Sequence, residues 1–180
     1  MRLLPKIMPL FLATSPMEKY TELRSSLTPV LPRLVEKFNY GLGIDVNCFT
    51  GETTSRLQGI FPELNIIGID KNQTAIDIAR DRYIGPSFTT ADVESEKILL
   101  TNEVQVIQIS EYTNLYDMLS RTFPCLDEEG MMIIHYKDED MNLIRELMRR
   151  NQQHPLRKRK GFLLSNMYLW EQEKTVILFK

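Results

Sequence analysis

Cysteine is scarce in this chain, with two residues, Cys48 and Cys125, among 180. They provide no disulfide framework and no spacing typical of a zinc site, which indicates a reducing compartment and no structural metal. No run of about eighteen apolar residues occurs, so the sequence predicts no transmembrane helix. The net charge of -2 excludes a protein that is basic overall. We therefore expect a cytoplasmic protein of ordinary globular composition.

Glycine is missing where a dinucleotide site would need it. The fingerprint G-x-G-x-x-G does not occur, which argues against a plain NAD site. What the chain does contain is a βαβ pattern between Leu42 and Asp70. The apolar run Leu42–Val46 precedes a turn-prone segment and a helical pattern, and a second apolar run, Ile66–Ile69, ends in Asp70. Such units join parallel strands and bind ligands at the carboxyl ends of those strands.

The acid that closes the second strand is the further clue to a ligand. A carboxylate at this point can accept hydrogen bonds from both hydroxyls of a ribose, so nucleoside-binding folds place Asp or Glu there. Asp70 occupies this position. The pattern therefore predicts a nucleoside site beside Asp70.

The same stretch resembles motif I of the class I S-adenosylmethionine-dependent methyltransferases, whose pattern is acid-x-G-x-G-x-G. Asp45 takes the position of the acid and Gly51 that of the last glycine, while Asn47 and Phe49 stand at the first two glycine positions. The words GETT after the last glycine and GID after the next strand are also typical of that family. The resemblance implies a doubly wound, mostly parallel α/β sheet of seven strands with an antiparallel last strand and helices on both faces.

The two replaced glycines have different physical consequences. Asn tolerates the left-handed backbone region best among non-glycine residues, so Asn47 is a mild replacement. Phe49 adds a benzyl group where family members bring backbone close to the cofactor. Either Phe49 turns away and packs on the sheet, or the pocket is altered or filled.

The resemblance also implies a cofactor, S-adenosylmethionine, and a set of residues around it. The backbone of the 47–51 loop would hold the methionine end, Asp70 the ribose and Asp92 the adenine amino group, with Val93 beside the ring. Asp92 can equally be an ordinary loop acid. The implied cofactor residues are Asp45, Asn47, Phe49, Gly51, Asp70, Lys71, Asp92, Val93 and Ser110, and Glu111 and Tyr112 are expected to line the acceptor site.

No catalytic residue is identifiable after the fourth predicted strand, 104–110. The sequence there, SEYTN from Ser110, lacks the D/N-P-P-Y/F motif of nucleobase and glutamine amino-methyltransferases. Pro124-Cys125 lies too far along the chain to act as a cytosine C5 nucleophile beside the methyl donor. His135 at the end of the fifth strand is either a base near the site or a structural residue.

The remaining elements follow from hydrophobic periodicity. Helices are expected at 18–38, broken by prolines, and at 74–83, 115–123 and 140–151, with Asn72 or Thr74 capping the second. Strands are expected at 87–91 and 131–136, with a turn at 126–130. The last two strands, 162–170 and 175–179, are expected to pair antiparallel across a tight turn near Gln172.

Two segments outside the core favour contact with partners. Residues 1–17 form an apolar and basic arm that packs on the domain or on a partner, or alternatively directs the chain to an organelle; residues 18–180 form one methyltransferase-like domain. A basic cluster near the end includes Arg157, Lys158, Arg159 and Lys160. It is either a solvated face or a docking site for RNA or an acidic partner.

Two functional hypotheses follow. The first is a methyltransferase that uses S-adenosylmethionine to methylate an acceptor, with a small molecule favoured. The second is a catalytically inactive protein of the same fold that acts as a structural or regulatory subunit. In this hypothesis the basic cluster is a candidate contact for RNA. A nucleotide-binding protein of another kind would need the glycines that are missing.

Overall fold

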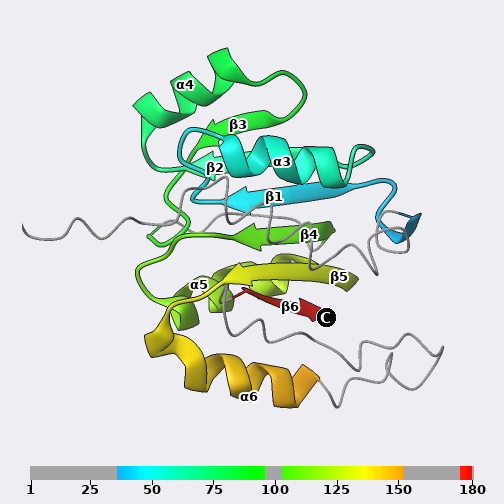
Figure 1. Ribbon diagram of the computed structural model, residues 1–180, viewed down its shortest axis with the longest axis vertical. Coiled ribbons are helices and arrows are strands. Elements are labelled where there is room, and N and C mark those ends of the chain that lie inside the picture. The colour runs from blue at the N-terminus through cyan, green and yellow to red at the C-terminus, as the bar shows by residue number, and fades with distance from the viewer. Residues whose placement is uncertain (1–35, 96–102, 152–174, 180) are drawn as a thin grey trace, which may run out of the picture.

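The computed structural model describes residues 36–95, 103–151 and 175–179, which form an α/β domain (Figure 1). The strands are β1 (Leu42–Val46), β2 (Asn65–Asp70), β3 (Ser87–Thr90), β4 (Val104–Ile109), β5 (Leu126–His135) and β6 (Thr175–Phe179). The helices are α3 (Glu52–Ile60), α4 (Gln73–Arg82), α5 (Leu115–Thr122) and α6 (Met141–Asn151), with short 3-10 helices η1 (Phe123–Cys125) and η2 (Asp138–Asp140).

One sheet carries all of the described strands, in the order β3-β2-β1-β4-β5-β6, which Figure 1 shows from top to bottom. Strands β1 to β5 run parallel, and β6 pairs antiparallel with β5. The chain moves outward from β1 to β3 and then returns to β4 on the other side of β1. The loops after β1 and β4 therefore diverge at a topological switch point, where α/β sheets bind their ligands.

Strand register brings the loops at this edge level with one another. Val46 lies opposite Ile69 of β2 and Ile109 of β4, and Ile109 lies opposite Ile134 of β5. Four strands thus end at nearly the same height, because each crossover returns the chain to the same starting edge. Their following loops are close enough to share side-chain contacts.

Helices cover both faces of the sheet, as expected from the sequence. On one face, Leu57 and Ile60 of α3 pack with Val106 and Ile133 from the sheet. On the other face, the buried residues of α5 and α6 pack with alternating strand residues; this larger cluster includes Leu115, Met118, Leu119, Ile144, Ile44, Ile107 and Ile134. The period of two along each strand assigns neighbouring residues to opposite faces. Burial on both sides explains why the strands are almost wholly apolar.

Several predicted elements are confirmed within one or two residues: the helices at 73–82, 115–122 and 141–151, and the strands at 87–90 and 104–109. Asn72 is the N-cap of α4, and its side-chain oxygen accepts a hydrogen bond from the amide of Ala75 at 3.2 Å. This bond satisfies one of the amides that the first helical turn leaves without an intrahelical partner.

The expected turn at 126–130 is wrong, since these residues belong to β5. Leu126 is buried and pairs with Val104, and the next pair, Met131 with Val106, is reached after a register shift. The acidic residues between them stay near the surface, where Gln105 donates to Asp127 at 2.8 Å. A bulge of this kind hides a strand from sequence reasoning because it interrupts the alternation of apolar and polar residues.

The mostly parallel sheet is confirmed, but the described residues hold six strands, so a sheet of seven is not shown. The predicted strand at 162–170, its turn near Gln172, the arm and helix within 1–35 and the basic residues 157–160 lie outside the described residues. Among residues 36–95, 103–151 and 175–179, no helix combines the length and apolar content needed to cross a membrane.

Gly51 and Gly59, at the two ends of α3, provide a matched test of how tightly the start of this helix packs against α4 and β3. A Cβ on Gly51 would lie 2.8 Å from Ala79 and 2.6 Å from the ring of Phe88, and the φ angle of Gly51 is 81°. A Cβ on Gly59 would meet nothing within 4 Å. We expect Gly51→Ala to lower the free energy of unfolding by about 2–4 kcal/mol.

Gly59→Ala should instead raise the free energy of unfolding by about 0.5–1 kcal/mol, because alanine favours a helix interior. Urea denaturation of the two variants beside the unmodified protein measures both effects. Equal stability of the two variants would contradict the packing described for Gly51.

Candidate functional site

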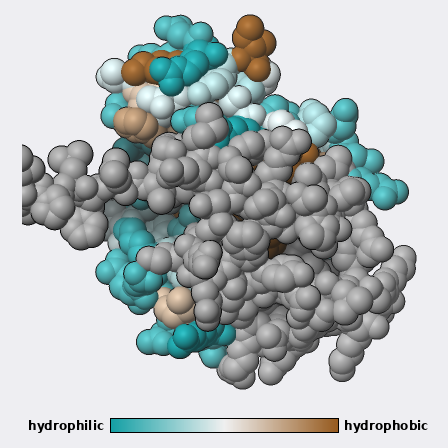
Figure 2. Space-filling view, viewed as in Figure 1, coloured by the Kyte–Doolittle hydropathy of each residue, from teal (hydrophilic) through white to brown (hydrophobic). Residues whose placement is uncertain are grey.

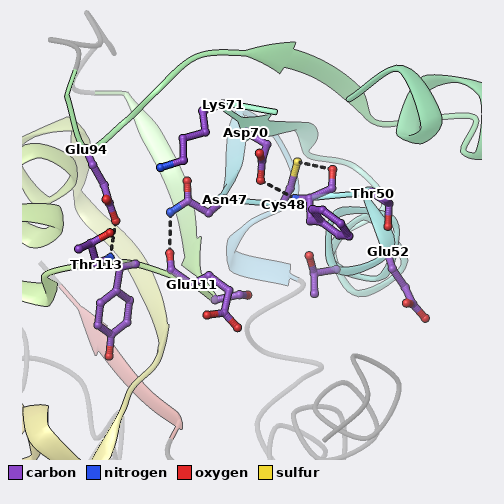
Figure 3. Close-up of a pocket in the computed structure, with 13 residues that line it drawn as sticks. Asn47, Cys48, Thr50, Glu52, Asp70, Lys71, Glu94, Glu111 and Thr113 are labelled. Atoms are coloured by element: carbon purple, nitrogen blue, oxygen red, sulfur yellow. Dashed lines mark hydrogen bonds between the residues drawn. The ribbon is translucent and has the colours of Figure 1, made fainter. Parts of the chain in front are cut away.

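A cavity of about 430 Å³ opens at the carboxyl ends of β1, β2 and β4 (Figure 3). Loops that follow these strands, together with the start of α3 and the loop after β3, form its walls. The lining residues are Asn47, Cys48, Phe49, Thr50, Glu52, Thr53, Asp70, Lys71, Glu94, Ser110, Glu111, Tyr112 and Thr113. Its volume lies within the range of about 300–1,000 Å³ that is typical of small-molecule sites.

The loop after β1 adopts the left-handed backbone conformation at alternate residues. The φ angles of Asn47, Phe49 and Gly51 are 57°, 50° and 81°. These are the three positions at which the motif I pattern carries glycine. The conformation that glycine normally provides is therefore preserved, although two side chains have been added, at a cost of about 1–2 kcal/mol for each non-glycine residue.

Hydrogen bonds from backbone amides hold this loop against β2 and close a turn within it. The amide of Cys48 donates to the carbonyl of Ile69 at 3.0 Å, and the amide of Gly51 donates to the carbonyl of Cys48 at 3.0 Å. The amide of Phe49 donates to Oδ2 of Asp70 at 2.8 Å. These bonds hold Phe49 and Gly51, two of the three left-handed residues, in place.

The side chain of Phe49 does not pack on the sheet, which decides one of the alternatives left open by the sequence. It is 60% exposed and lines the cavity. An added aromatic surface at this point alters the cavity wall, and the cavity remains open.

Asp70 lies where the sequence predicts a ribose-binding carboxylate. Its side chain is 8% exposed, faces the cavity, and accepts the amide of Phe49 at one oxygen and the amide of Asn72 at the other, the latter at 2.8 Å. Each carboxylate oxygen has a second acceptor position, so two further donors can be accommodated. The anchored carboxylate is thus prepared to bind a diol.

Asp45 does not line the cavity but lies beneath it. Its side chain is fully buried, and Oδ2 accepts hydrogen bonds from the hydroxyls of Thr53 and Thr54 at 2.7 Å each. Oδ1 has no hydrogen-bond partner within the described part of the chain. Asp45 therefore ties the start of α3 to β1 and supports the loop indirectly.

The electrostatic state of Asp45 follows from this burial. Removal from water disfavours the charged carboxylate and raises its pKa from 3.8 to about 6, although the two threonine hydrogen bonds oppose the shift. Nearby Asp70 adds a smaller repulsion that raises the pKa further. In the folded protein, the carboxyl group of Asp45 therefore changes its charge near pH 6.

The other predicted site residues are distributed between the cavity and the core. Lys71, Ser110, Glu111 and Tyr112 all line the cavity. The Tyr112 hydroxyl donates to Oδ2 of Asp140 at 2.7 Å and accepts the amide of Lys137 at 2.9 Å. Tyr112 is therefore held by the loop after β5, and its hydroxyl is engaged there.

Asp92 and Val93 are not among the lining residues of the cavity. The carboxylate of Asp92 accepts the amide of Glu94 at 3.0 Å within a turn, whereas the side chain of Val93 is 2% exposed and packs in the core. A role of Asp92 toward adenine stays a prediction.

The predicted site residues omit six that line the cavity, namely Cys48, Thr50, Glu52, Thr53, Glu94 and Thr113. Glu94 lines the cavity from the loop after β3, and its carboxylate accepts the amide of Thr113 from the loop after β4. For Glu94 and Thr113 the available signal was position, because both residues follow strands that end at the same edge.

Other candidates lie away from the cavity. Cys125 is buried in η1, where its thiol donates to the carbonyl of Arg121 at 3.3 Å, and His135 is a buried residue at the end of β5. Neither lines the cavity. Within the described ranges, no three His, Cys, Asp or Glu side chains gather closely enough to hold a metal ion.

Comparison with known proteins identifies the fold. No protein-family model matches the chain. A TehB-like SAM-dependent methyltransferase from Corynebacterium glutamicum superposes with a TM-score of 0.50 at 15% identity, covering 73% of this chain and 83% of that one. YjhP from E. coli gives a TM-score of 0.51 at 15% identity, covering 67% of this chain and 49% of that one. The chain has the class I methyltransferase fold.

One viral relative agrees with this fold at the level of sequence. The "Putative methyltransferase 235L" of Invertebrate iridescent virus 6 is 31% identical over 55 residues. The matched part amounts to 31% of this chain and 21% of the viral protein, so the chain spans about a fifth of that relative's length.

The buried carboxylate of Asp45 predicts a specific pH dependence of stability. Because the pKa is raised in the folded state, folding takes up a proton between about pH 4 and 6, and the stabilisation present below pH 4 is lost as the pH rises through about 6. A shift from 3.8 to about 6 corresponds to about 3 kcal/mol.

Replacing Asp45 with Asn should remove this contribution. We expect the difference in unfolding free energy between the unmodified protein and Asp45→Asn to change by up to about 3 kcal/mol between pH 4 and 7, in favour of the variant at the higher pH. Urea denaturation at intervals across this range measures the difference. A difference that stays constant with pH would contradict the raised pKa.

Proposed function

We propose that this protein binds S-adenosylmethionine in the cavity above β1, β2 and β4 and transfers its methyl group to an acceptor, with a small molecule favoured. The observation that carries the proposal is the anchored carboxylate of Asp70, which faces a cavity at the switch point of a methyltransferase fold. A solved structure of the same fold, from C. glutamicum, is described as SAM-dependent.

The residues around the cavity fit the parts of this cofactor. The carboxylate of Asp70 would accept the ribose hydroxyls through its remaining lone pairs. The first turn of α3, which follows Gly51, presents backbone amides and the positive end of the helix dipole, both suited to the carboxylate of the methionine part. Lys71 follows Asp70 in the chain and lines the cavity, so it would also lie near the ribose.

The charge of the cavity favours a cationic ligand. Four acidic residues, Glu52, Asp70, Glu94 and Glu111, line it together with one basic residue, Lys71. Glu52 is paired with Arg56 through a salt bridge, which reduces its contribution. The remaining acidic excess stabilises a positively charged sulfonium and repels phosphate groups such as those of NADP.

The chemistry requires little more from the protein than orientation. When bound, S-adenosylmethionine supplies an electrophilic methyl group on its sulfonium. The protein has to align an acceptor with that methyl group and to exclude water. Ser110, Glu111 and Tyr112 form the wall where the acceptor would lie, and the engaged hydroxyl of Tyr112 leaves it a shaping role.

Calorimetric titration with S-adenosylhomocysteine tests the cofactor site. We expect micromolar binding, and we expect Asp70→Asn to weaken it by about tenfold to a hundredfold, since hydrogen bonds to a charged group contribute about 1.5–3 kcal/mol. Asp81→Asn on α4, an exposed residue outside the cavity, is the matched control and should bind normally.

Two results would count against this proposal. Absence of heat at millimolar ligand would favour the inactive alternative, a protein of this fold that serves as a structural or regulatory subunit. Binding of NAD in place of S-adenosylhomocysteine would assign the cavity to a different nucleotide.

The acidic lining yields a second expected outcome. S-adenosylmethionine should bind several-fold more tightly than S-adenosylhomocysteine at low ionic strength, because the sulfonium adds one positive charge. The ratio of the two dissociation constants should decrease toward one in about 0.5 M salt, where the Debye length is only a few ångströms. Competition titration at two salt concentrations measures this ratio, and a ratio that does not depend on salt would exclude the electrostatic explanation.

A further inference from the structure

A side-chain hydrogen bond joins the loop after β1 directly to the loop after β4. The amide nitrogen Nδ2 of Asn47 donates to the backbone carbonyl of Glu111 at 2.7 Å, between residues 64 positions apart in the chain. Figure 3 shows this bond between the two loops, with Lys71 and Asp70 drawn above Asn47 and Glu111 below it. The bond therefore links the predicted cofactor loop to the predicted acceptor wall.

The loop after β4 is held from two other directions as well. The amide of Thr113 donates to the carboxylate of Glu94 in the loop after β3 (Figure 3). Lys137, in the loop after β5, donates from Nζ to the carbonyl of Tyr112 at 2.7 Å and lies over the Tyr112 ring. Asn47 adds the contact on the side of the loop after β1, so that loops from four strands are joined around the cavity.

Residue 47 has to meet two requirements, a positive φ angle and a side-chain N–H donor. A residue at φ 57° must tolerate the left-handed region, which glycine, asparagine and aspartate do best. Of these three, asparagine alone brings a side-chain N–H donor that can reach a carbonyl. Glycine at this position would provide the backbone conformation without the bond.

We propose that Asn47 is a positioning residue that fixes the 110–114 loop against the cofactor loop. The inference rests on the proposed function for the identity of the ligand, whereas the bond itself involves only atoms of this chain. A cofactor that orders the loop after β1 would also order the acceptor wall through this bond, and an acceptor bound at that wall would in return strengthen cofactor binding by the same factor. The replacement of a glycine would thus give the chain a direct link between its two half-sites.

Amide hydrogen exchange on Asn47→Gly and Asn47→Asp tests this inference. Both variants keep a residue that tolerates the left-handed conformation, and both remove the donor. In the ligand-free state, we expect exchange in residues 110–114 to become about fivefold to tenfold faster. Exchange in α4, residues 73–82, should stay within twofold and serves as the internal reference.

Asn65→Asp provides a matched control. Asn65 is exposed and begins β2, whereas the cavity lies at the other end of this strand, beside Asp70. The change introduces the same charge as Asn47→Asp. It should leave the exchange of residues 110–114 unchanged. Faster exchange in all segments of the Asn47 variants would reveal a general loss of stability and would overturn the positioning role, as would unchanged exchange in 110–114.

Repeating the experiment with saturating S-adenosylhomocysteine tests the coupling. We expect the ligand to slow exchange of residues 110–114 in the unmodified protein and to have little effect on them in Asn47→Gly, with saturation of each protein established by calorimetric titration. Bound ligand that leaves this loop equally labile in the unmodified protein would overturn the coupling. If no ligand binds at all, the proposed function fails, while the ligand-free comparison still decides whether Asn47 holds the loop.

Discussion

The carboxylate of Asp70 is the group on which the candidate site depends. It accepts the amide of Phe49 on one oxygen and the amide of Asn72 on the other, so a single side chain holds the loop after β1 and the start of α4 in fixed relation. Burying a carboxylate lowers the free energy of unfolding unless it receives such hydrogen bonds. Having received them, it presents the remaining lone pairs to the cavity.

The loop after β1 shows how a motif can keep its conformation while its residues change. Glycine is common in such loops because it reaches positive φ angles at little cost. Here Asn47 and Phe49 also have positive φ angles. A hydrogen bond to Asp70 holds Phe49, and one to Ile69 holds the adjacent Cys48. Conformation and composition can therefore separate, and the new side chains become available for other contacts.

Support for the site comes from below as well as from the sides. Asp45 is fully buried and connects β1 to the first turn of α3 through Thr53 and Thr54. The loops after β3, β4 and β5 are joined above the sheet by the bonds of Glu94, Tyr112 and Lys137. These polar side chains thus position the loops, whereas Asp70 and the N-terminus of α3 are well placed to bind a ligand.

The sequence by itself determined the parts of the structure that depend on local patterns. Apolar runs and helical spacing located β1, β2, β4 and the helices between them. Asn72 was one of two candidate caps of α4, and the acid that ends β2 was a predicted site residue that does line the cavity. These features depend on the periodicity of residues close together in the chain. Tertiary structure decided the other features, because those features depend on strand register. Register brings the carbonyl of Glu111 to Asn47, carries Val93 into the core, and lets Leu126 pair with Val104 across a bulge that reads as a turn. Residues so far apart in the chain meet only when the crossovers have placed their strands side by side, and no local pattern encodes that distance.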